Sequence, residues 1–385
     1  MMTRCISNPR IAVIDLSISG WGAGKIISRM MAMGLVSAGA RVDFATQECE
    51  SAPKGANLLA LQPRLPMPGE NSMRRLLGKP PHDRLSHALR SAKADIVLPV
   101  VLPPAFRRQP FIGWIPDFQH LHIPELYTPL QRKTLNERFQ TLSSRASRMW
   151  FSSNDAAKDF RTQFPKYVGK EFVANFPSIF AFSPPEGDHI KVRERFRIPE
   201  RFALVINQFW THKNHHVVAE AVGMLHGKGL RIPLIMAGIP SDYRDRENSA
   251  LSATLQSLSQ SGAWADSRVL GKLDRAEIEG LLRSATVLIQ PSRFEGWNTS
   301  VEDAKALGCP VILSDIPVHR EQCPEALGFF GCNDAAALAA ALELHWNSLP
   351  TRPDVVRERD ALAVASAQAA RFGRQMFEIC KEAVK

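Results

Sequence analysis

Two acidic residues flank the start of a predicted helix in the second half of the sequence. Glu295 lies in the loop after an apolar run that ends near Gln290, and Asp303 lies about one turn inside the helix that follows. The first turn of a helix carries unpaired N–H groups and a partial positive charge, so it favours phosphate. Carboxylates instead accept hydrogen bonds from sugar and ribose hydroxyls. This segment therefore predicts a site for a ligand that carries both phosphate and hydroxyl groups.

Capping chemistry predicts the ends of this helix. Thr299 and Glu302 have the three-residue spacing of a capping box, so Thr299 is expected to cap the helix. Gly308 is expected to end it, because glycine adopts the left-handed conformation without strain. The capping box explains Glu302, whereas Glu295 precedes the predicted cap by four residues and needs another role.

A second polar segment, residues 207–215, follows the apolar run that opens the second half. Asn214 is expected to cap the next helix, which places Lys213 at the mouth of that helix, where a cation can reach a pyrophosphate. A solvated surface lysine is the alternative. His212, His215 and His216 are not expected to bind metal, because the predicted helix begins between His212 and His216.

The first half contains a further polar segment after a strand, from Trp114 to His120. Ligands of parallel α/β sheets bind at the carboxyl ends of strands, so His120 is a candidate site residue, with a satisfied structural histidine as the alternative. The turn at residues 19–24 reads G-x-G-x-G rather than the dinucleotide-binding G-x-G-x-x-G. Asp43, about 20 residues later, falls within a predicted strand, which argues against a dehydrogenase.

Alternating strands and helices position these segments. The predicted strands are Ile11–Leu16, Arg41–Ala45, Asp95–Leu102, Phe111–Ile115, Arg148–Ser152, Glu171–Phe176, Ala203–Asn207, Ile232–Ala237, Arg268–Leu270, Thr286–Gln290 and Val311–Leu313. Pro99 indicates the end of its strand or an edge position. The βαβ pattern predicts an α/β fold with two doubly wound, Rossmann-like domains facing each other across a cleft. The expected boundaries are residues 1–183, a linker at 184–200, residues 201–365, and a C-terminal helix at 366–385 that packs back on the first domain.

Length and composition agree with a two-domain globular protein. The chain has 385 residues, of which 45% are hydrophobic and 22% charged. No apolar run reaches the roughly 20 residues that span a bilayer, and residues 1–10 lack the apolar stretch of a secretory signal. We therefore expect a cytoplasmic protein. The six cysteines form no C-x-x-C pair, which disfavours a zinc site or a disulfide framework.

Positive charge is concentrated in the first half. Residues 1–185 contain 24 Lys and Arg against 13 Asp and Glu, a net +11, whereas residues 186–385 contain 24 against 25, a net −1. A basic half typically meets an anionic partner, although a basic soluble surface is the alternative. Nucleic acid is disfavoured, because the sequence shows no recognition helix and only three Tyr for stacking.

The loop around Glu295 resembles the donor-binding signature of retaining GT-B glycosyltransferases of family 4. That signature has a Glu in an E-G-[FW] loop, a second Glu eight residues later, and then A-x-A-x-G-x-P-V-I. Glu295-Gly296-Trp297 matches the loop, and the downstream matches are Ala304, Ala306, Gly308, Pro310, Val311 and Ile312. Asp303 stands in place of the second Glu. The resemblance is dense over residues 203–330, with islands at 11–24 and 112–127.

This resemblance implies a GT-B fold whose second domain binds a nucleotide-diphosphate sugar. Lys213 matches the family Lys that binds the pyrophosphate, and Gln208 replaces the Arg that accompanies it. Glu295 would hold sugar hydroxyls and support an oxocarbenium-like transition state, and Asp303 would hold the ribose. The other residues that the resemblance assigns to the donor are Gly22, Asn207, Gln208, Gly296, Trp297, Asn298 and Thr299.

The resemblance also implies the reaction. His120 would be catalytic together with Glu295, with Asp117 beside it, and no metal or other cofactor would be required. A hexose would move from the donor, with GDP-mannose favoured, to a saccharide or lipid-linked saccharide in cell-surface polysaccharide synthesis. The basic first half would contact the inner membrane face. The alternative is a non-catalytic protein of the same fold that binds a nucleotide sugar or an anionic polymer.

Overall fold

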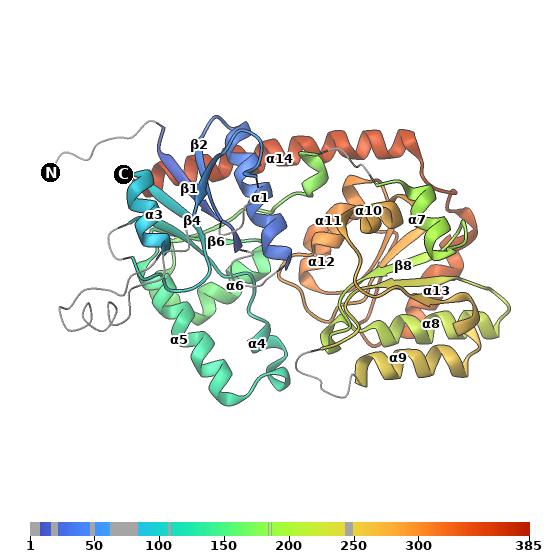
Figure 1. The fold of residues 1–385 in the computed structure, drawn as a ribbon. Helices are drawn as coiled ribbons and strands as arrows, with labels where there is room; N and C mark the ends of the chain where they lie inside the picture. The colour runs from blue at the N-terminus through green and yellow to red at the C-terminus, as the bar shows by residue number, and fades with distance from the viewer. Residues whose placement is uncertain are drawn as a thin grey trace, which may run out of the picture. The chain divides into compact units, whose positions relative to one another are not determined.

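The computed structural model describes residues 8–16, 22–46, 51–61, 84–106, 109–183, 185, 187–242 and 249–385. The chain divides into two compact units. Unit 1 comprises Met1–Phe182 and Ala367–Lys385, and unit 2 comprises Ser183–Ser366. Each unit has its own sheet and core, and Figure 1 labels most of the helices and some of the strands.

Within the described residues, unit 1 contains a seven-stranded sheet in the order β3-β2-β1-β4-β5-β6-β7, and every recorded strand pair is parallel. The strands are β1 (Arg10–Ile14), β2 (Arg41–Thr46), β3 (Asn57–Ala60), β4 (Ile96–Val100), β5 (Phe111–Trp114), β6 (Arg148–Phe151) and β7 (Glu171–Val173). The helices are α1 (Gly22–Ser37), α3 (Arg84–Ala92), α4 (Gln119–His122), α5 (Pro129–Arg145) and α6 (Asn154–Gln163), with 3-10 turns at Pro124–Leu126, Pro165–Tyr167 and Ile179–Ala181. Side chains of α3, α5 and α6 share one apolar core with the strands.

Unit 2 contains a six-stranded sheet in the order β10-β9-β8-β11-β12-β13, counted over the residues described, and its recorded pairs are again parallel. The strands are β8 (Ala203–Ile206), β9 (Leu234–Ala237), β10 (Arg268–Val269), β11 (Val287–Gln290), β12 (Val311–Ser314) and β13 (Gly328–Phe330). The helices are α7 (His189–Phe196), α8 (His215–Gly227), α9 (Ser249–Gln260), α10 (Arg275–Ser284), α11 (Thr299–Ala306), α12 (Pro317–Gln322) and α13 (Ala335–His345), with 3-10 turns at Thr211–Lys213, Ala263–Asp266 and Trp346–Ser348. Helices α8, α9 and α13 cover one face of this sheet (Figure 1).

The last helix, α14 (Val355–Ala383), begins in unit 2 and ends in unit 1. In unit 1 it crosses α1 at two glycines: a Cβ on Gly373 would lie 2.1 Å from the Gly34 carbonyl oxygen. Its Gln375 side chain donates to the Val173 carbonyl of β7 at 2.7 Å. Phe372 is buried beside Trp150 of β6, with ring centroids 6.1 Å apart.

The structure confirms the two parallel-sheet, Rossmann-like folds and corrects one strand prediction. Pro99 lies inside β4, which is a central strand between β1 and β5, and not at a strand end or a sheet edge. The register between β4 and β5 shifts between Val97 and Val100. This irregularity accommodates the missing N–H of proline, because no regular ladder bond is required at that position.

Candidate active site

The strand order of unit 2 places two predicted segments next to each other. Strand β8 lies between β9 and β11, so the chain turns to opposite sides of the sheet after β8 and after β11. Such a topological switch point opens a crevice at the carboxyl ends of the two strands. Asn207 follows β8, Gln290 ends β11, and the Asn207 amide donates to the Gln290 side-chain oxygen. The two polar segments therefore meet at this edge of the sheet.

A close backbone approach fixes the first of these loops. Gly238, which follows β9, has φ +157°, and a Cβ at this position would lie 1.8 Å from the Asn207 carbonyl oxygen. The Gly238 N–H also donates to the Gly271 carbonyl at 2.8 Å. Only glycine fits between these neighbours, and it thereby sets the position of the Asn207 backbone.

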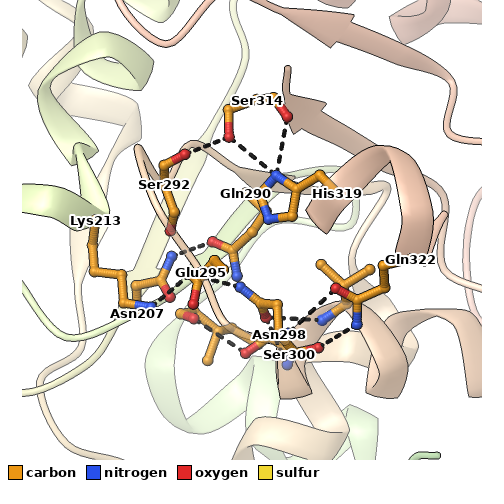
Figure 2. Close-up of polar contacts among 12 residues, drawn as sticks. Asn207, Lys213, Gln290, Ser292, Glu295, Asn298, Ser300, Ser314, His319 and Gln322 are labelled. Atoms are coloured by element: carbon orange, nitrogen blue, oxygen red, sulfur yellow. Dashed lines mark hydrogen bonds and ion pairs between the residues drawn. The ribbon is translucent and has the colours of Figure 1, made fainter. Parts of the chain in front are cut away.

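Lys213 and Glu295 form an ion pair at the switch point (Figure 2). The Lys213 Nζ lies 2.6 Å from Glu295 Oε1, and the two side chains are 15% and 9% exposed. Asn298 Nδ2 donates to the same oxygen at 2.9 Å. Gln208, Gly296, Trp297 and Thr299 belong to the same two loops and keep part of their surface exposed. The site thus combines a nearly buried charge pair with partly exposed residues in the loops that carry it.

The electrostatics of Glu295 show which effect dominates in this pair. Burial raises the pKa of the Glu295 carboxyl, but the charge and hydrogen bond of Lys213, together with smaller contributions from neighbouring groups, lower it by more. The net pKa of Glu295 therefore lies below its ordinary value of 4.5. The carboxylate is ionised at neutral pH, as an acceptor of sugar hydroxyl groups must be.

Helix α11 begins at Thr299, one residue earlier than a cap at Thr299 would imply. Asn298, not Thr299, occupies the cap position, and its side chain accepts from the Ser300 and Val301 N–H groups at 2.9 and 3.2 Å. The capping-box prediction was wrong because Asn is an equally good cap and precedes Thr299 directly. Two N–H groups that could bind phosphate are therefore already used. The predicted end is confirmed, since Gly308 has φ +62° just after the helix.

Glu302 has a structural environment that the capping box did not predict. Its Oε1 accepts from Lys305 Nζ at 3.2 Å and from Gln322 Nε2 at 3.0 Å. Burial raises the pKa of Glu302 despite the opposing charge of Lys305. This carboxyl therefore joins α11 to α12 within the fold.

Asn214 occupies the predicted cap position of α8 but makes different contacts. It is left-handed, with φ 57°, and its side chain makes no capping bond. Its Nδ2 donates instead to the carbonyls of Pro291, at 3.3 Å, and Cys332, at 2.6 Å. The prediction of a side-chain cap was wrong, because the amide holds the loops after β11 and β13 against the start of α8.

The histidines of this segment are part of the packing. His215 stacks on Phe209 with ring centroids 4.0 Å apart, and burial lowers its pKa to about 3. The buried His212 accepts at its carbonyl from the Arg293 N–H at 2.8 Å. Across the described part of the chain, no group of three His, Cys, Asp or Glu side chains is arranged to hold a metal ion.

Asp303, predicted to bind ribose, forms an ion pair of its own. The Arg275 Nη1 of α10 lies 2.7 Å from Asp303 Oδ2, and Asp303 is 6% exposed while Arg275 is 34% exposed. A ligand hydroxyl would therefore meet a carboxylate that is already oriented by arginine. Sequence spacing could not reveal Arg275, because it reaches the site from a separate helix.

The predicted site residues of unit 1 have local partners. His120 is 2% exposed, its Nε2 lies 2.8 Å from Asn136 Oδ1, and its ring packs against Phe118 and Phe139. This environment matches the structural alternative stated for His120. Asp117 Oδ1 accepts from the Gln119 N–H at 2.9 Å.

Two further predictions concern the amino-terminal part of unit 1. Gly22 is the first residue of α1, so residues 22–24 of the predicted turn are helical, and residues 19–21 lie outside the described residues. Asp43 is buried in β2, and Arg10 Nε lies 2.5 Å from its Oδ2. The ion pair with Arg10 accounts for the buried Asp43 carboxylate, so no role in binding the ribose of a dinucleotide is needed.

The sequence did not reveal the role of one buried histidine near Glu295. His319 on α12 is 0% exposed, and its Nδ1 lies 3.0 Å from the Ser314 carbonyl oxygen. Ser314 Oγ in turn donates to the Ser292 carbonyl at 2.5 Å, in the same loop as Glu295 (Figure 2). A lone histidine after a proline gives no chemical pattern from which this connection could be predicted.

Comparison with known proteins agrees with this fold. Residues 188–356 match the family model described as glycosyl transferases group 1. The chain is similar to a glycosyltransferase from Rickettsia africae, with 16% identity, a TM-score of 0.68 and coverage of 98% of this chain and 99% of that chain. It is also similar to sucrose-phosphate synthase from Thermosynechococcus elongatus, with 15% identity, a TM-score of 0.67 and coverage of 97% of each chain. The HepE protein of Anabaena, solved with UDP and glucose, is 15% identical, with a TM-score of 0.62 and coverage of 96% and 99%.

These similarities define the fold of the protein. The fold is GT-B, with two Rossmann-like α/β domains, as the sequence predicted. The family match and the shared fold support the prediction that the chain is a glycosyltransferase. A search of curated proteins gives no match. Among the described residues, no helix is both long enough and apolar enough to cross a membrane.

Proposed function

We propose that the chain is a retaining family 4 glycosyltransferase that moves a hexose from a nucleotide-diphosphate sugar to a saccharide or lipid-linked saccharide acceptor. The observation that carries this proposal is the nearly buried Lys213–Glu295 pair at the switch point of unit 2. A carboxylate and an ammonium group at a strand edge suit a ligand with both hydroxyl and phosphate groups.

The contacts assign a role to each side chain in this proposal. Lys213 and Asn298 both bind Glu295 Oε1, so Oε2 is the oxygen that we assign to the hydroxyls of the transferred sugar. The Lys213 ammonium, whose side chain is 15% exposed, would contact the diphosphate. Asp303, oriented by Arg275, would accept from the ribose hydroxyls. His120 stays a predicted catalytic residue that contacts the donor sugar, and Asp117 stays a predicted site residue beside it.

The proposed chemistry needs no protein nucleophile. The bond between the anomeric carbon and the leaving phosphate oxygen breaks, and the acceptor oxygen bonds to the same face of that carbon. The acceptor proton passes to the leaving phosphate oxygen, which carries the developing negative charge. Lys213 stabilises that charge, and Glu295 stabilises the oxocarbenium-like sugar.

The donor nucleotide is the first quantity to measure. The sequence favours GDP-mannose, whereas several proteins of similar fold were solved with UDP or UDP-glucose. We would record thermal unfolding with GDP, UDP, ADP, dTDP and their sugars, with and without EDTA. A ligand at 100 times its Kd adds about 2.7 kcal/mol, which shifts Tm by several degrees. Stabilisation by one nucleotide that is lost in Lys213→Ala supports the proposal, and stabilisation by none contradicts it.

Transfer itself separates an enzyme from a non-catalytic binding protein. With the stabilising donor, release of the nucleoside diphosphate should depend on a saccharide or lipid-linked acceptor. The anomeric configuration of the product, read by NMR, should match that of the donor. Binding without any release would favour the non-catalytic alternative.

The basic first half adds a proposal about location. Its net charge of +11 suits contact with an anionic membrane surface, where each nearby Lys or Arg contributes about 1 kcal/mol. Sedimentation with phosphatidylserine vesicles at low salt should exceed sedimentation with neutral vesicles and decline as salt is raised. Equal sedimentation with both would contradict the proposal.

A further inference from the structure

The loop that carries Glu295 is held at both ends by one short helix. The loop begins at Pro291, after β11, and ends at Asn298, the cap of α11. Near its end, Gln322 of α12 donates to the Asn298 carbonyl at 2.7 Å and accepts from the Asn298 N–H at 3.3 Å. Near its start, His319 of the same helix acts through Ser314.

The hydrogen bonds near the start of the loop assign the histidine tautomer. Ser314 Oγ lies 2.5 Å from the Ser292 carbonyl oxygen, which can only accept, so the hydroxyl proton is used there. His319 Nδ1 lies 3.0 Å from the Ser314 carbonyl oxygen and 3.1 Å from Ser314 Oγ. Nδ1 must therefore carry the proton and donate to Ser314. The sequence of bonds runs from His319 through Ser314 to the Ser292 carbonyl.

Burial makes this connection rigid and keeps the imidazole neutral. His319, Ser314 and Ser292 are each 0% exposed, so water cannot replace a lost bond without a change in the loop. Burial also lowers the pKa of His319 to about 4, even though the negative charge of Glu295 opposes this shift. A neutral ring does not compete with Lys213 for the Glu295 carboxylate.

We propose that His319 is a positioning residue: through Ser314 it holds the Glu295 loop in the conformation in which Glu295 reaches the transferred sugar. This inference rests on the proposed glycosyltransferase function. It assigns the positioning of the loop to the Nδ1–H of His319 and not to Nε2, which has no hydrogen-bond partner among the described residues. Figure 2 shows Nδ1 turned toward Ser314.

Two substitutions distinguish the nitrogens of this ring. His319→Asn places an amide N–H near the position of Nδ1, whereas His319→Gln extends its amide toward the position of Nε2. Ser314→Ala removes the bond to Ser292 and leaves the Ser314 carbonyl in place. We expect His319→Gln and Ser314→Ala to lower kcat for transfer by about 10- to 100-fold, because small displacements of a catalytic group have effects of this size. His319→Asn should keep most of the wild-type kcat.

Binding measurements separate positioning from general damage. Calorimetry measures the affinity for the nucleoside diphosphate and the affinity for the nucleotide sugar. The difference between the two binding free energies is the contribution of the sugar. His319→Gln and Ser314→Ala should lose this contribution and keep the affinity for the nucleoside diphosphate within about twofold. A wild-type kcat in both variants, rescue by Gln and not by Asn, or an equal loss of both affinities would overturn the proposal.

A readout independent of catalysis separates this inference from the proposed function. If the wild type transfers no sugar, the proposed function fails, and the Glu295 pKa can still be followed by carbon NMR of labelled Glu. Displacement of the loop weakens the contact with Lys213, so the pKa of Glu295 should rise in Ser314→Ala and stay at the wild-type value in His319→Asn. An unchanged pKa in Ser314→Ala would show that the loop needs no positioning through Ser314.

Discussion

Removing one member of the Lys213–Glu295 pair should destabilise the protein far more than removing both. The two side chains are 15% and 9% exposed, so either survivor would be a nearly buried charge with its partner gone. Loss of one partner from a buried pair costs about 3–5 kcal/mol, whereas neutral replacement of both is often close to neutral. For a domain of the size of unit 2, each kcal/mol shifts Tm by roughly 2–4 °C. Lys213→Met and Glu295→Gln should therefore each lower Tm by about 6–20 °C, and the double variant should recover most of this loss.

The dependence on pH follows from the pKa of Glu295. In the wild type, Lys213 holds this pKa below 4.5, so the pair stabilises the fold above the pKa of the unfolded chain and the stabilisation is lost as pH falls through the folded pKa. In Lys213→Met the largest favourable contributions to the carboxylate are lost while the hydrogen bond from Asn298 remains, so we expect burial to dominate and the folded pKa to rise above the unfolded value. In this variant the neutral carboxyl form of Glu295 destabilises the fold little at low pH, whereas the buried carboxylate destabilises it increasingly as pH rises. The Tm difference between wild type and Lys213→Met should therefore shrink from pH 8 to pH 5.

A surface pair provides the matched control. Lys228 and Glu343 lie 2.8 Å apart, but their side chains are 59% and 47% exposed. Exposed pairs contribute about 0–1 kcal/mol, so Lys228→Met should lower Tm by a few degrees at most. Chemical unfolding of the single and double variants completes the cycle. Effects of Lys213→Met and Glu295→Gln that add to within about 0.5 kcal/mol, or a Tm difference that does not change with pH, would refute the reasoning.

Three further predictions test other features of the fold. Gly238→Ala should destabilise unit 2 and abolish nucleotide binding, because its Cβ would lie 1.8 Å from a backbone oxygen. The control Gly271→Ala, at φ +71° with open space around the Cβ, should cost only about 1–2 kcal/mol. Equal effects of the two substitutions in thermal unfolding would contradict this prediction. Burial lowers the pKa values of His215 and His319 from 6.5 to about 3 and about 4, so between pH 6.5 and 4 the unfolded chain binds protons that the folded chain does not. The unfolding free energy should fall with falling pH in that window, and His319→Asn should reduce the slope by about 1.4 kcal/mol per pH unit, as urea unfolding at several pH values would show. Gly373→Ala should displace α14 from α1, seen as faster hydrogen exchange in both helices, and unchanged exchange would show that the crossing is not tight.

The central strands and one edge strand of each sheet, β7 and β10, could be predicted from the sequence, whereas the opposite edge strands β3 and β13 could not. Strands buried on both faces read as continuous apolar runs, which is why β8 and β11 were found. Strand β3 is mostly exposed and β13 is only partly buried, so neither gives such a run. Helix α5 was also missed, because its composition is polar, although Thr128 and Gln131 form a capping box that could have marked its start.

The site was predictable where it depends on chain order and unpredictable where it depends on packing. Lys213 and Glu295 each follow a strand, and the strand order brings those strands together. The contact of Arg275 with Asp303 requires two helices to lie side by side, and no local pattern encodes that. Burial of His120 similarly depends on Phe139, the aromatic residue that α5 contributes once it is folded.

Helix α14 makes the order of folding differ from the order of synthesis. Unit 2 is one continuous stretch, Ser183–Ser366, whereas unit 1 needs both Met1–Phe182 and Ala367–Lys385. At about 5–20 residues per second, a ribosome needs roughly 10–40 s to pass from the end of the first stretch to the last residues. When residue 366 has been added, the second unit has its whole sequence, while the backbone of α1 at Gly34 and the edge of β7 still lack their covering helix. The half of the protein that is made first is therefore completed last.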